Sequence, residues 1–264
     1  MSLTRGGGPL APDASTRVNY HIDSPERCLY LHQFPRRVRA EFGGRTVVDS
    51  RQGFLLHESN LLPVFYFPWD DIAESLLVAT EHTTHCPFKG EASYWTLRVG
   101  DAVAHNAVWS YLDPVPAARW LRGLAAMYWS AAHAWYDEEE KVHAHLRDPF
   151  HRVDVRQSSD IVRVSLGEEV VAVSSYPKVL SETGLPNRYY LPPEGIHSDL
   201  LVPSRTRTRC PYKGEASYWN VRVGERELAD AAWSYNHPLK DAHDVREYVC
   251  FNHDELTIAR EEQP

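Results

Sequence analysis

Residues 85–95 read HCPFKGEASYW and residues 209–219 read RCPYKGEASYW, so one segment occurs twice at a displacement of 124 residues. The match continues without a gap over residues 38–114 and 162–238, where 32 of 77 positions are identical. Such a constant offset over a long stretch indicates that a whole domain was duplicated. The sequence therefore predicts two lobes that share one fold.

The hydropathy pattern inside each copy is that of β-strands. Residues 161–165 and 169–174 are rich in valine around Gly167, which predicts a hairpin, and residues 37–50 repeat this pattern around Gly43. The segments YWTLRV and YWNVRV, which follow the repeated glycines, are further strands. Regular alternation of strand and helix is absent, which excludes a doubly wound parallel sheet. We predict a mainly β (α+β) fold of two tandem lobes of curled antiparallel sheet.

After the paired prolines Pro114 and Pro238 the hydrophobic spacing changes. Trp120, Leu124 and Met127 recur at helical intervals, as do residues 239–249 more weakly. We expect each lobe to be followed by one helix, the first of which ends near Trp135. The expected organisation is a disordered tail at 1–17, a first lobe at 18–135, a connection or further strand at 136–150 and a second lobe at 151–264.

Composition narrows the classes of function. The 264 residues carry a net charge of −8, which opposes general binding to nucleic acids or anionic membranes. The chain has no apolar run of membrane-spanning length and no apolar secretory signal at its start, and its four cysteines are too few for a disulfide scaffold. We expect a cytoplasmic protein with reduced thiols that binds neither nucleic acid nor membrane.

The repeated segment places a lysine on a tight loop. Proline after cysteine bends the chain, and glycine after lysine permits a positive φ, so Lys89 and Lys213 each precede a strand at a turn. Either the lysine covers an aromatic ring and keeps its ammonium in water, or it enters an aromatic pocket as an anion anchor or nucleophile. The ring candidates and adjacent cysteines are Tyr94, Trp95, Trp109 and Tyr111 with Cys86 in the first copy, and Tyr218, Trp219, Trp233 and Tyr235 with Cys210 in the second.

A glutamate recurs before a turn and a pair of rings. Glu58 and Glu182 precede turn residues that lead to Tyr66 and Tyr190. This glutamate is either a general acid or base, or the ion-pair partner of Lys213 or Arg188. Arg188 has no charged counterpart in the first copy, which makes the second copy the better candidate for an anion site.

Other motifs argue against metal and nucleotide chemistry. His82, His85 and Cys86 give HxxHC, but Thr206 and Arg209 replace both histidines in the second copy. The chain has no P-loop, GxGxxG, GxSxG or HExxH motif. Cys86 and Cys210 lack a recurring histidine partner, so small buried side chains explain them better than nucleophiles. We expect no metal and no cofactor.

Taken together, CPYKGEASYW, AAWSY, ETGLPNRYYLPPE and DPFHRVDV resemble the family catalogued as domain of unknown function 427, in its two-copy form. The similarity covers the chain from about residue 18. The family is sometimes labelled nucleotidyltransferase-like, but the acidic constellation that this activity requires is absent here. The resemblance implies β-tent-like lobes, with a pocket beneath the sheet lined by the repeated lysine, glutamate and aromatic residues.

These observations support three functions. The first is binding of a small anionic or carbonyl-containing molecule in an aromatic pocket with Lys213 and Glu182. The second is an enzyme in which Lys213 forms an imine or polarises a carbonyl while Glu182 transfers the proton. The third is a protein-interaction module that uses exposed aromatic side chains. In the second copy the ligand residues would be Arg188, Tyr190, Cys210, Tyr218, Trp219, Trp233 and Tyr235, and in the first Lys89, Glu58, Tyr94, Trp95, Trp109 and Tyr111.

Overall fold

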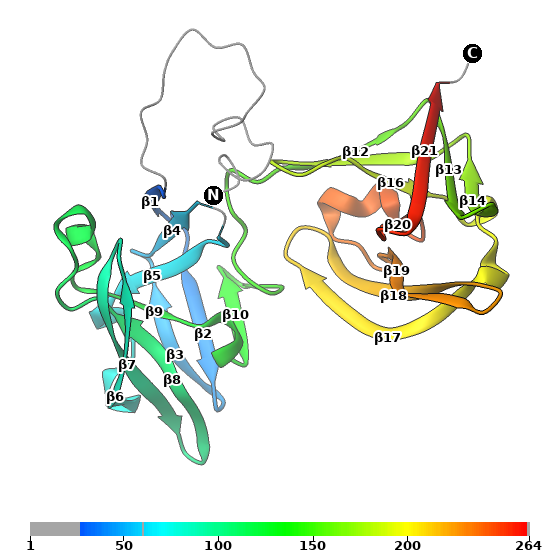
Figure 1. The fold of residues 1–264 in the computed structure, drawn as a ribbon. Helices are drawn as coiled ribbons and strands as arrows, with labels where there is room; N and C mark the ends of the chain where they lie inside the picture. The colour runs from blue at the N-terminus through cyan, green and yellow to red at the C-terminus, as the bar shows by residue number, and fades with distance from the viewer. Residues whose placement is uncertain (1–26, 60, 263–264) are drawn as a thin grey trace, which may run out of the picture. The chain divides into compact units, whose positions relative to one another are not determined.

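The computed structural model describes residues 27–59 and 61–262, so the predicted tail at 1–17 lies outside the described residues. The chain divides into two compact units, with the boundary between Asp148 and Pro149. Each unit is built from antiparallel sheets, which confirms the mainly β prediction (Figure 1). None of the helices in the described part of the chain has the length and hydropathy of a membrane-spanning helix.

The first unit contains one seven-stranded and one four-stranded sheet. In spatial order the larger sheet consists of β1 (Leu29–Gln33), β4 (Phe54–Glu58), β5 (Val64–Pro68), β9 (Leu124–Met127), β8 (Ala102–Ser110), β7 (Gly90–Val99) and β6 (Leu77–Cys86). The smaller sheet consists of β11 (Glu140–Lys141), β10 (Ala134–Asp137), β2 (Val38–Phe42) and β3 (Arg45–Ser50).

The second unit repeats this arrangement with a seven-stranded and a three-stranded sheet. The larger sheet consists of β12 (Val153–Gln157), β15 (Lys178–Glu182), β16 (Arg188–Leu191), β20 (Val249–Phe251), β19 (Arg226–Ser234), β18 (Gly214–Val223) and β17 (Leu201–Cys210). The smaller sheet consists of β14 (Glu169–Ser174), β13 (Asp160–Leu166) and β21 (Leu256–Glu262).

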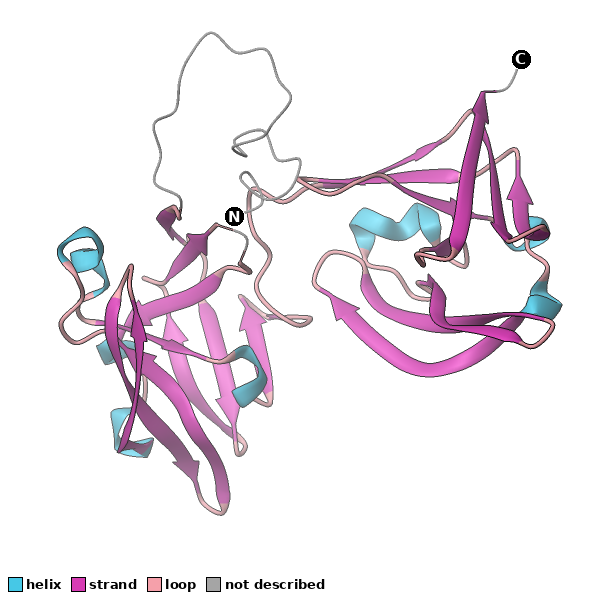
Figure 2. Ribbon diagram, viewed as in Figure 1, coloured by secondary structure: helices cyan, strands magenta, loops and turns pink. Residues whose placement is uncertain are grey.

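Each large sheet has an apolar core on both faces. In the second unit Val164, Leu191 and Phe251 belong to the core between the two sheets, whereas Tyr190 and Tyr235 belong to a core on the other face. The second core also includes Ala242 and Val245 of the 3₁₀ helix η8 (Lys240–Val245). Figures 1 and 2 show this large sheet curling around η8, with β12 on one side of the helix and β17–β19 on the other.

The predicted long helix after Pro114 is wrong. The chain instead forms the 3₁₀ helix η4 (Pro116–Leu121), turns at Gly123 with φ +81° and enters strand β9. All four residues of β9 are buried, because this strand lies in the middle of a sheet covered on both faces. A strand buried on both faces has a continuous apolar run instead of period-two alternation, which is why the spacing resembled that of a helix.

The second unit departs from the helix prediction in the same way. Residues 239–249 form η8 and the start of β20, with only a short 3₁₀ segment between strands (Figure 2). Residues predicted as a connection belong in part to the first unit, since β11 pairs with β10 and the fully buried Leu146 joins that unit's core.

Candidate functional site

The repeated lysine lies in the turn between the two longest strands of each unit. Lys213 follows β17, and its carbonyl oxygen accepts a hydrogen bond from Leu239 N at 3.0 Å. Gly214 has φ +100°, and a Cβ there would lie 3.2 Å from the carbonyl oxygen of His237. Only glycine combines this φ with so close an approach. Lys89 occupies the same place in the first unit, where Val115 N donates to its carbonyl oxygen at 3.1 Å.

Each lysine makes a buried ion pair with the repeated glutamate. Lys213 Nζ lies 2.5 Å from Glu182 Oε2, and Lys89 Nζ lies 2.5 Å from Glu58 Oε1. The side chains of Lys213 and Glu182 are 13% and 7% exposed. Glutamate lies at the end of the second strand in the sheet order, whereas lysine follows the seventh, so the pair joins distant parts of one curled sheet. The ion pair therefore links opposite parts of the curled sheet.

A histidine that the sequence analysis missed completes the second cluster. His151 Nε2 lies 3.3 Å from Glu182 Oε1, and its ring centroid lies 4.3 Å from that of Tyr212. Arg27 precedes Glu58 by the same 31 residues, and its guanidinium lies 5.4 Å from the centroid of the Phe88 ring. Extending the 124-residue offset upstream of Val38 would have paired Arg27 with His151 and so revealed a basic residue in both copies.

The neighbours of Glu182 hold it in its charged form. Burial opposes ionisation of the carboxyl group, but the hydrogen bond from His151, the charge of Lys213 and the hydrogen bond from Lys213 together outweigh it. The pKa of Glu182 is lowered from 4.5 to about 2. Glu182 is therefore an anion at neutral pH and a very weak base.

A buried phenol lies beside each ion pair without a hydrogen-bond partner of its own. Tyr235 and Tyr111 are each 5% exposed, and neither hydroxyl bonds to another residue of the described chain. Burial, the Cys210 thiol and the Glu182 carboxylate raise the pKa of Tyr235, so its phenol stays protonated. Lys89 Nζ lies 5.6 Å from the centroid of the Tyr111 ring. Both phenols are therefore hydrogen-bond donors next to a buried charge.

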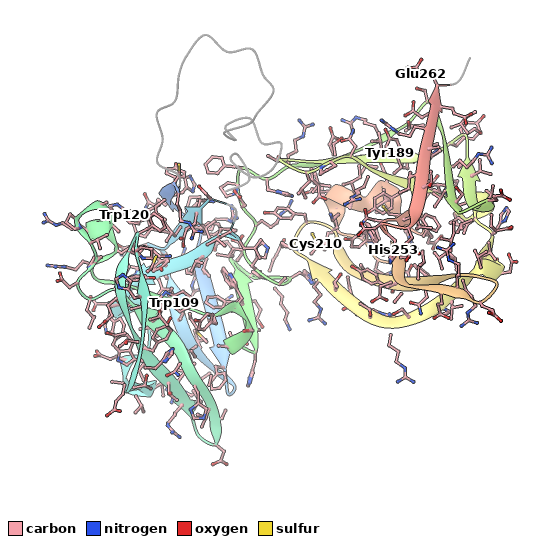
Figure 3. All side chains as sticks on the ribbon, viewed as in Figure 1. Trp109, Trp120, Tyr189, Cys210, His253 and Glu262 are labelled. Carbon is pink, nitrogen blue, oxygen red and sulfur yellow. The ribbon has the colours of Figure 1, made fainter. Side chains whose placement is uncertain are left out.

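The other rings of the cluster have partners within the protein. Trp233 Nε1 donates to the Tyr190 hydroxyl at 3.1 Å, and Thr208 Oγ1 lies 2.9 Å from the Tyr218 hydroxyl. The first unit repeats both contacts, with Trp109 Nε1 to the Tyr66 hydroxyl at 3.2 Å and Thr84 Oγ1 to the Tyr94 hydroxyl at 2.9 Å. Figure 3 labels Trp109, and it also shows Cys210 at the end of β17. Tyr111 and Tyr235 differ from these rings in having an unused hydroxyl.

Two kinds of predicted site residue, two tryptophans and an arginine, lie outside the cluster. Trp219 packs against the core between the two sheets, and Trp95 lies in the corresponding core with its ring 4.6 Å from that of Trp69. Because side chains alternate along a strand, each tryptophan points away from the tyrosine that precedes it. Arg188 donates to Asn252 Oδ1, so the lysine and not this arginine pairs with Glu182.

The geometry repeats in two units, and so does the match to a known family. The model of a family described as a domain of unknown function, DUF427, matches residues 30–138 and again residues 154–262. The chain is a tandem member of the DUF427 family. The two matches are displaced by the same 124 residues as the sequence repeat, so both DUF427 copies contain the lysine, the glutamate and the unpartnered tyrosine. A search of the curated proteins finds no match to this DUF427 protein.

Proposed function

We propose that each DUF427 unit binds a small anionic or carbonyl-containing molecule at its lysine–glutamate–tyrosine cluster. The observation that carries the proposal is a tyrosine hydroxyl that makes no hydrogen bond within the described chain, beside a largely buried ion pair, at the same place in both units. Neither hydroxyl oxygen is among the fully enclosed side-chain atoms of the described chain that lack a partner, so each hydroxyl can be reached from solution and can donate to a ligand oxygen. In this proposal each unit is a β-tent-like module that holds its ligand beneath the curled sheet.

The cluster has unused hydrogen-bond donors for such a ligand. The Lys213 ammonium has three N–H groups, of which one donates to Glu182 at 2.5 Å. A ligand oxygen that accepts from Lys213 and from Tyr235 would gain two hydrogen bonds, one of them charge-assisted. Glu182 then fixes the ammonium in place and does not act on the ligand itself.

Tyrosine NMR tests the proposal on the full chain. The protein carries ¹³C-labelled tyrosine, and the ring signals of Tyr111 and Tyr235 are assigned with Tyr111→Phe and Tyr235→Phe. Inorganic phosphate, acetate and pyruvate serve as probes. We expect at least one of them to shift both assigned signals in a saturable way. In Tyr235→Phe, binding in the second unit is followed through the ring signal of the neighbouring Tyr218, assigned with Tyr218→Phe, and it should weaken while the response of Tyr111 stays unchanged.

Tyr218→Phe is the matched control, because it too removes one phenol hydroxyl, this one on β18. The Tyr218 hydroxyl already has Thr208 as its partner. It should leave probe affinity at Tyr235 within about twofold, since it removes no group that the ligand contacts. Signals of Tyr111 and Tyr235 that do not respond to any of the three probes would reject an anion or small-carbonyl site.

An enzyme that uses Lys213 as a nucleophile is the second candidate, because imine chemistry requires an amine and an acid–base group in contact. The lowered pKa of Glu182 counts against it, since a carboxylate with a pKa of about 2 removes a proton from the ammonium poorly. Borohydride reduction in the presence of pyruvate separates the two candidates. A mass increase on Lys213 would establish the imine, whereas saturable NMR shifts without an adduct would leave binding alone.

A further inference from the structure

The second unit contains a hollow of about 330 Å³ between its two sheets, on the opposite face of the large sheet from Tyr190 and Tyr235. Neither Lys213 nor Glu182 lines it. Its base is apolar, because Val164, Leu191 and Phe251 are almost fully buried. The lining residues come from β13, β16, β20, β21 and the segment before β16, and they are Val164, Pro186, Asn187, Arg188, Tyr189, Leu191, Phe251, Ile258 and Arg260.

The first unit fills the corresponding space with aromatic rings. Trp135 pairs with Ala40 of β2 and is 4% exposed, whereas Ile258 pairs with the counterpart Val164 and is 39% exposed. The Trp135 ring lies 6.3 Å from that of Phe65, whose counterpart Tyr189 lines the hollow.

A second ring of the first unit is also replaced. Phe34 N donates to Gly53 O at 2.8 Å and Ser158 N to Pro177 O at 2.9 Å, so Phe34 and Ser158 occupy equivalent positions. The Phe34 ring packs on Phe65 at 6.1 Å, and the serine leaves that space without a ring. Duplicated cores of one fold are close-packed by default, so smaller and more polar residues at equivalent positions leave room for another molecule.

Two arginines and a phenol give the rim of the hollow its polarity. Arg260 Nη1 donates to the Tyr189 hydroxyl at 2.8 Å, and that hydroxyl lies 3.4 Å from Asp160 Oδ2. Arg188 uses Nη1 to bond Asn252. A guanidinium has five N–H donors, so both arginines retain donors for an incoming anion. Tyr189, which lies between the two sheets, is labelled in Figure 3.

We propose that this hollow binds an amphipathic organic anion whose apolar body fills the space between the sheets and whose carboxylate meets Arg188 and Arg260 at the rim. The volume of about 330 Å³ is within the range of small-ligand sites, at its lower end. The buried base favours an apolar group, because burying an unpaired polar group there would be costly. The planar arginine fork favours a carboxylate. The site is distinct from the lysine–glutamate cluster and belongs to the second unit alone.

Isothermal titration of the full chain tests the proposal with octanoate, and with 1-octanol as the neutral probe of the same length. We expect one octanoate per chain and an affinity at least tenfold higher than that for octanol. Arg260→Gln and Arg188→Gln should each weaken octanoate binding about tenfold, because each removes a charge-assisted contact. Arg163→Gln is the matched control, since Arg163 is an exposed residue of β13 that does not line the hollow.

A second pair of variants tests the location. Ile258→Trp places the bulky ring of the first unit into the hollow and should weaken octanoate binding at least tenfold. Thr257→Trp adds the same ring one residue away on β21, at an exposed position that does not line the hollow, and should leave the affinity within twofold. Thermal unfolding of each variant establishes that it is folded.

Three results would overturn the proposal: no saturable heat with octanoate up to its solubility limit, equal affinity for octanol, or unchanged affinity in folded Ile258→Trp. The result does not depend on the proposed function. Tyr235→Phe, which tests the lysine–glutamate–tyrosine cluster, should leave octanoate affinity unchanged because Tyr235 faces the other core.

Discussion

Replacing the carboxylate of Glu182 should change both the stability of the second unit and its dependence on pH. The pKa of Glu182 is lowered from 4.5 to about 2 in the folded protein, so the charged form stabilises the fold above pH 4.5 and the stabilisation is lost as the pH falls toward 2. One pKa unit corresponds to about 1.4 kcal/mol, which gives about 3 kcal/mol for the full effect. Glu182→Gln should therefore lower the free energy of unfolding by about 3 kcal/mol at pH 7.

The difference between the wild type and Glu182→Gln should shrink in acid. Linkage predicts that the difference falls from about 3 kcal/mol at pH 7 to about 1.4 kcal/mol at pH 3, because the carboxyl group of the unfolded chain is protonated at pH 3 and folding must then release that proton. Urea unfolding is monitored by pulsed hydrogen–deuterium exchange and mass spectrometry, and the peptides of each unit report the stability of that unit separately. The measurement is made at pH 7, 4 and 3.

Glu168→Gln is the control, because Glu168 is an exposed glutamate in the turn between β13 and β14. It removes one carboxylate of the same unit and should change stability by no more than about 0.5 kcal/mol at any of these pH values. A difference between the wild type and Glu182→Gln that stays constant from pH 7 to pH 3 would refute the assignment of a tightly paired carboxylate to Glu182.

Three further outcomes are expected from the same structure. Lys213→Met should destabilise the second unit by about 3 kcal/mol, because it leaves Glu182 without its lysine. The double variant Lys213→Met with Glu182→Leu should recover part of that loss in the same urea assay. A double variant whose loss equals the sum of the single losses would contradict a coupled pair. Gly214→Ala should lower the free energy of unfolding by at least about 1 kcal/mol more than Gly224→Ala does. Both glycines have positive φ, but only at Gly214 would a Cβ approach a carbonyl oxygen, at 3.2 Å. Equal losses of stability in thermal unfolding would show that the close approach does not matter. Cys250 is fully buried and its pKa is raised to about 12 by burial, so iodoacetamide at pH 8 should label it about a thousandfold more slowly than the half-buried Cys210, as followed by mass spectrometry; comparable rates would mean that this core opens readily.

The sequence by itself determined the duplication, the β character and the positions of several strands. The offset of 124 residues needs no structure, and valine-rich segments around Gly167 and Gly43 form the hairpins β13–β14 and β2–β3 as predicted. The turn at Lys213 was also predictable, because glycine after lysine signals a backbone that other residues rarely adopt, and Gly214 has φ +100°. Hairpins and turns could be predicted because their conformation depends on residues that are neighbours in the sequence.

The tertiary structure alone decided which residues meet. Glu182 and Lys213 lie 31 residues apart at opposite parts of the sheet order, and only the curl of the sheet around η8 brings their side chains to 2.5 Å. The same dependence explains the error at β9, whose apolar run is set by burial on both faces and not by local periodicity. The hollow beside Tyr189 follows from packing between two sheets, and its cause is visible only when Ile258 and Trp135 are compared across the paired strands of each unit. Strand pairing at long range, which depends on the whole chain, therefore fixed both candidate sites.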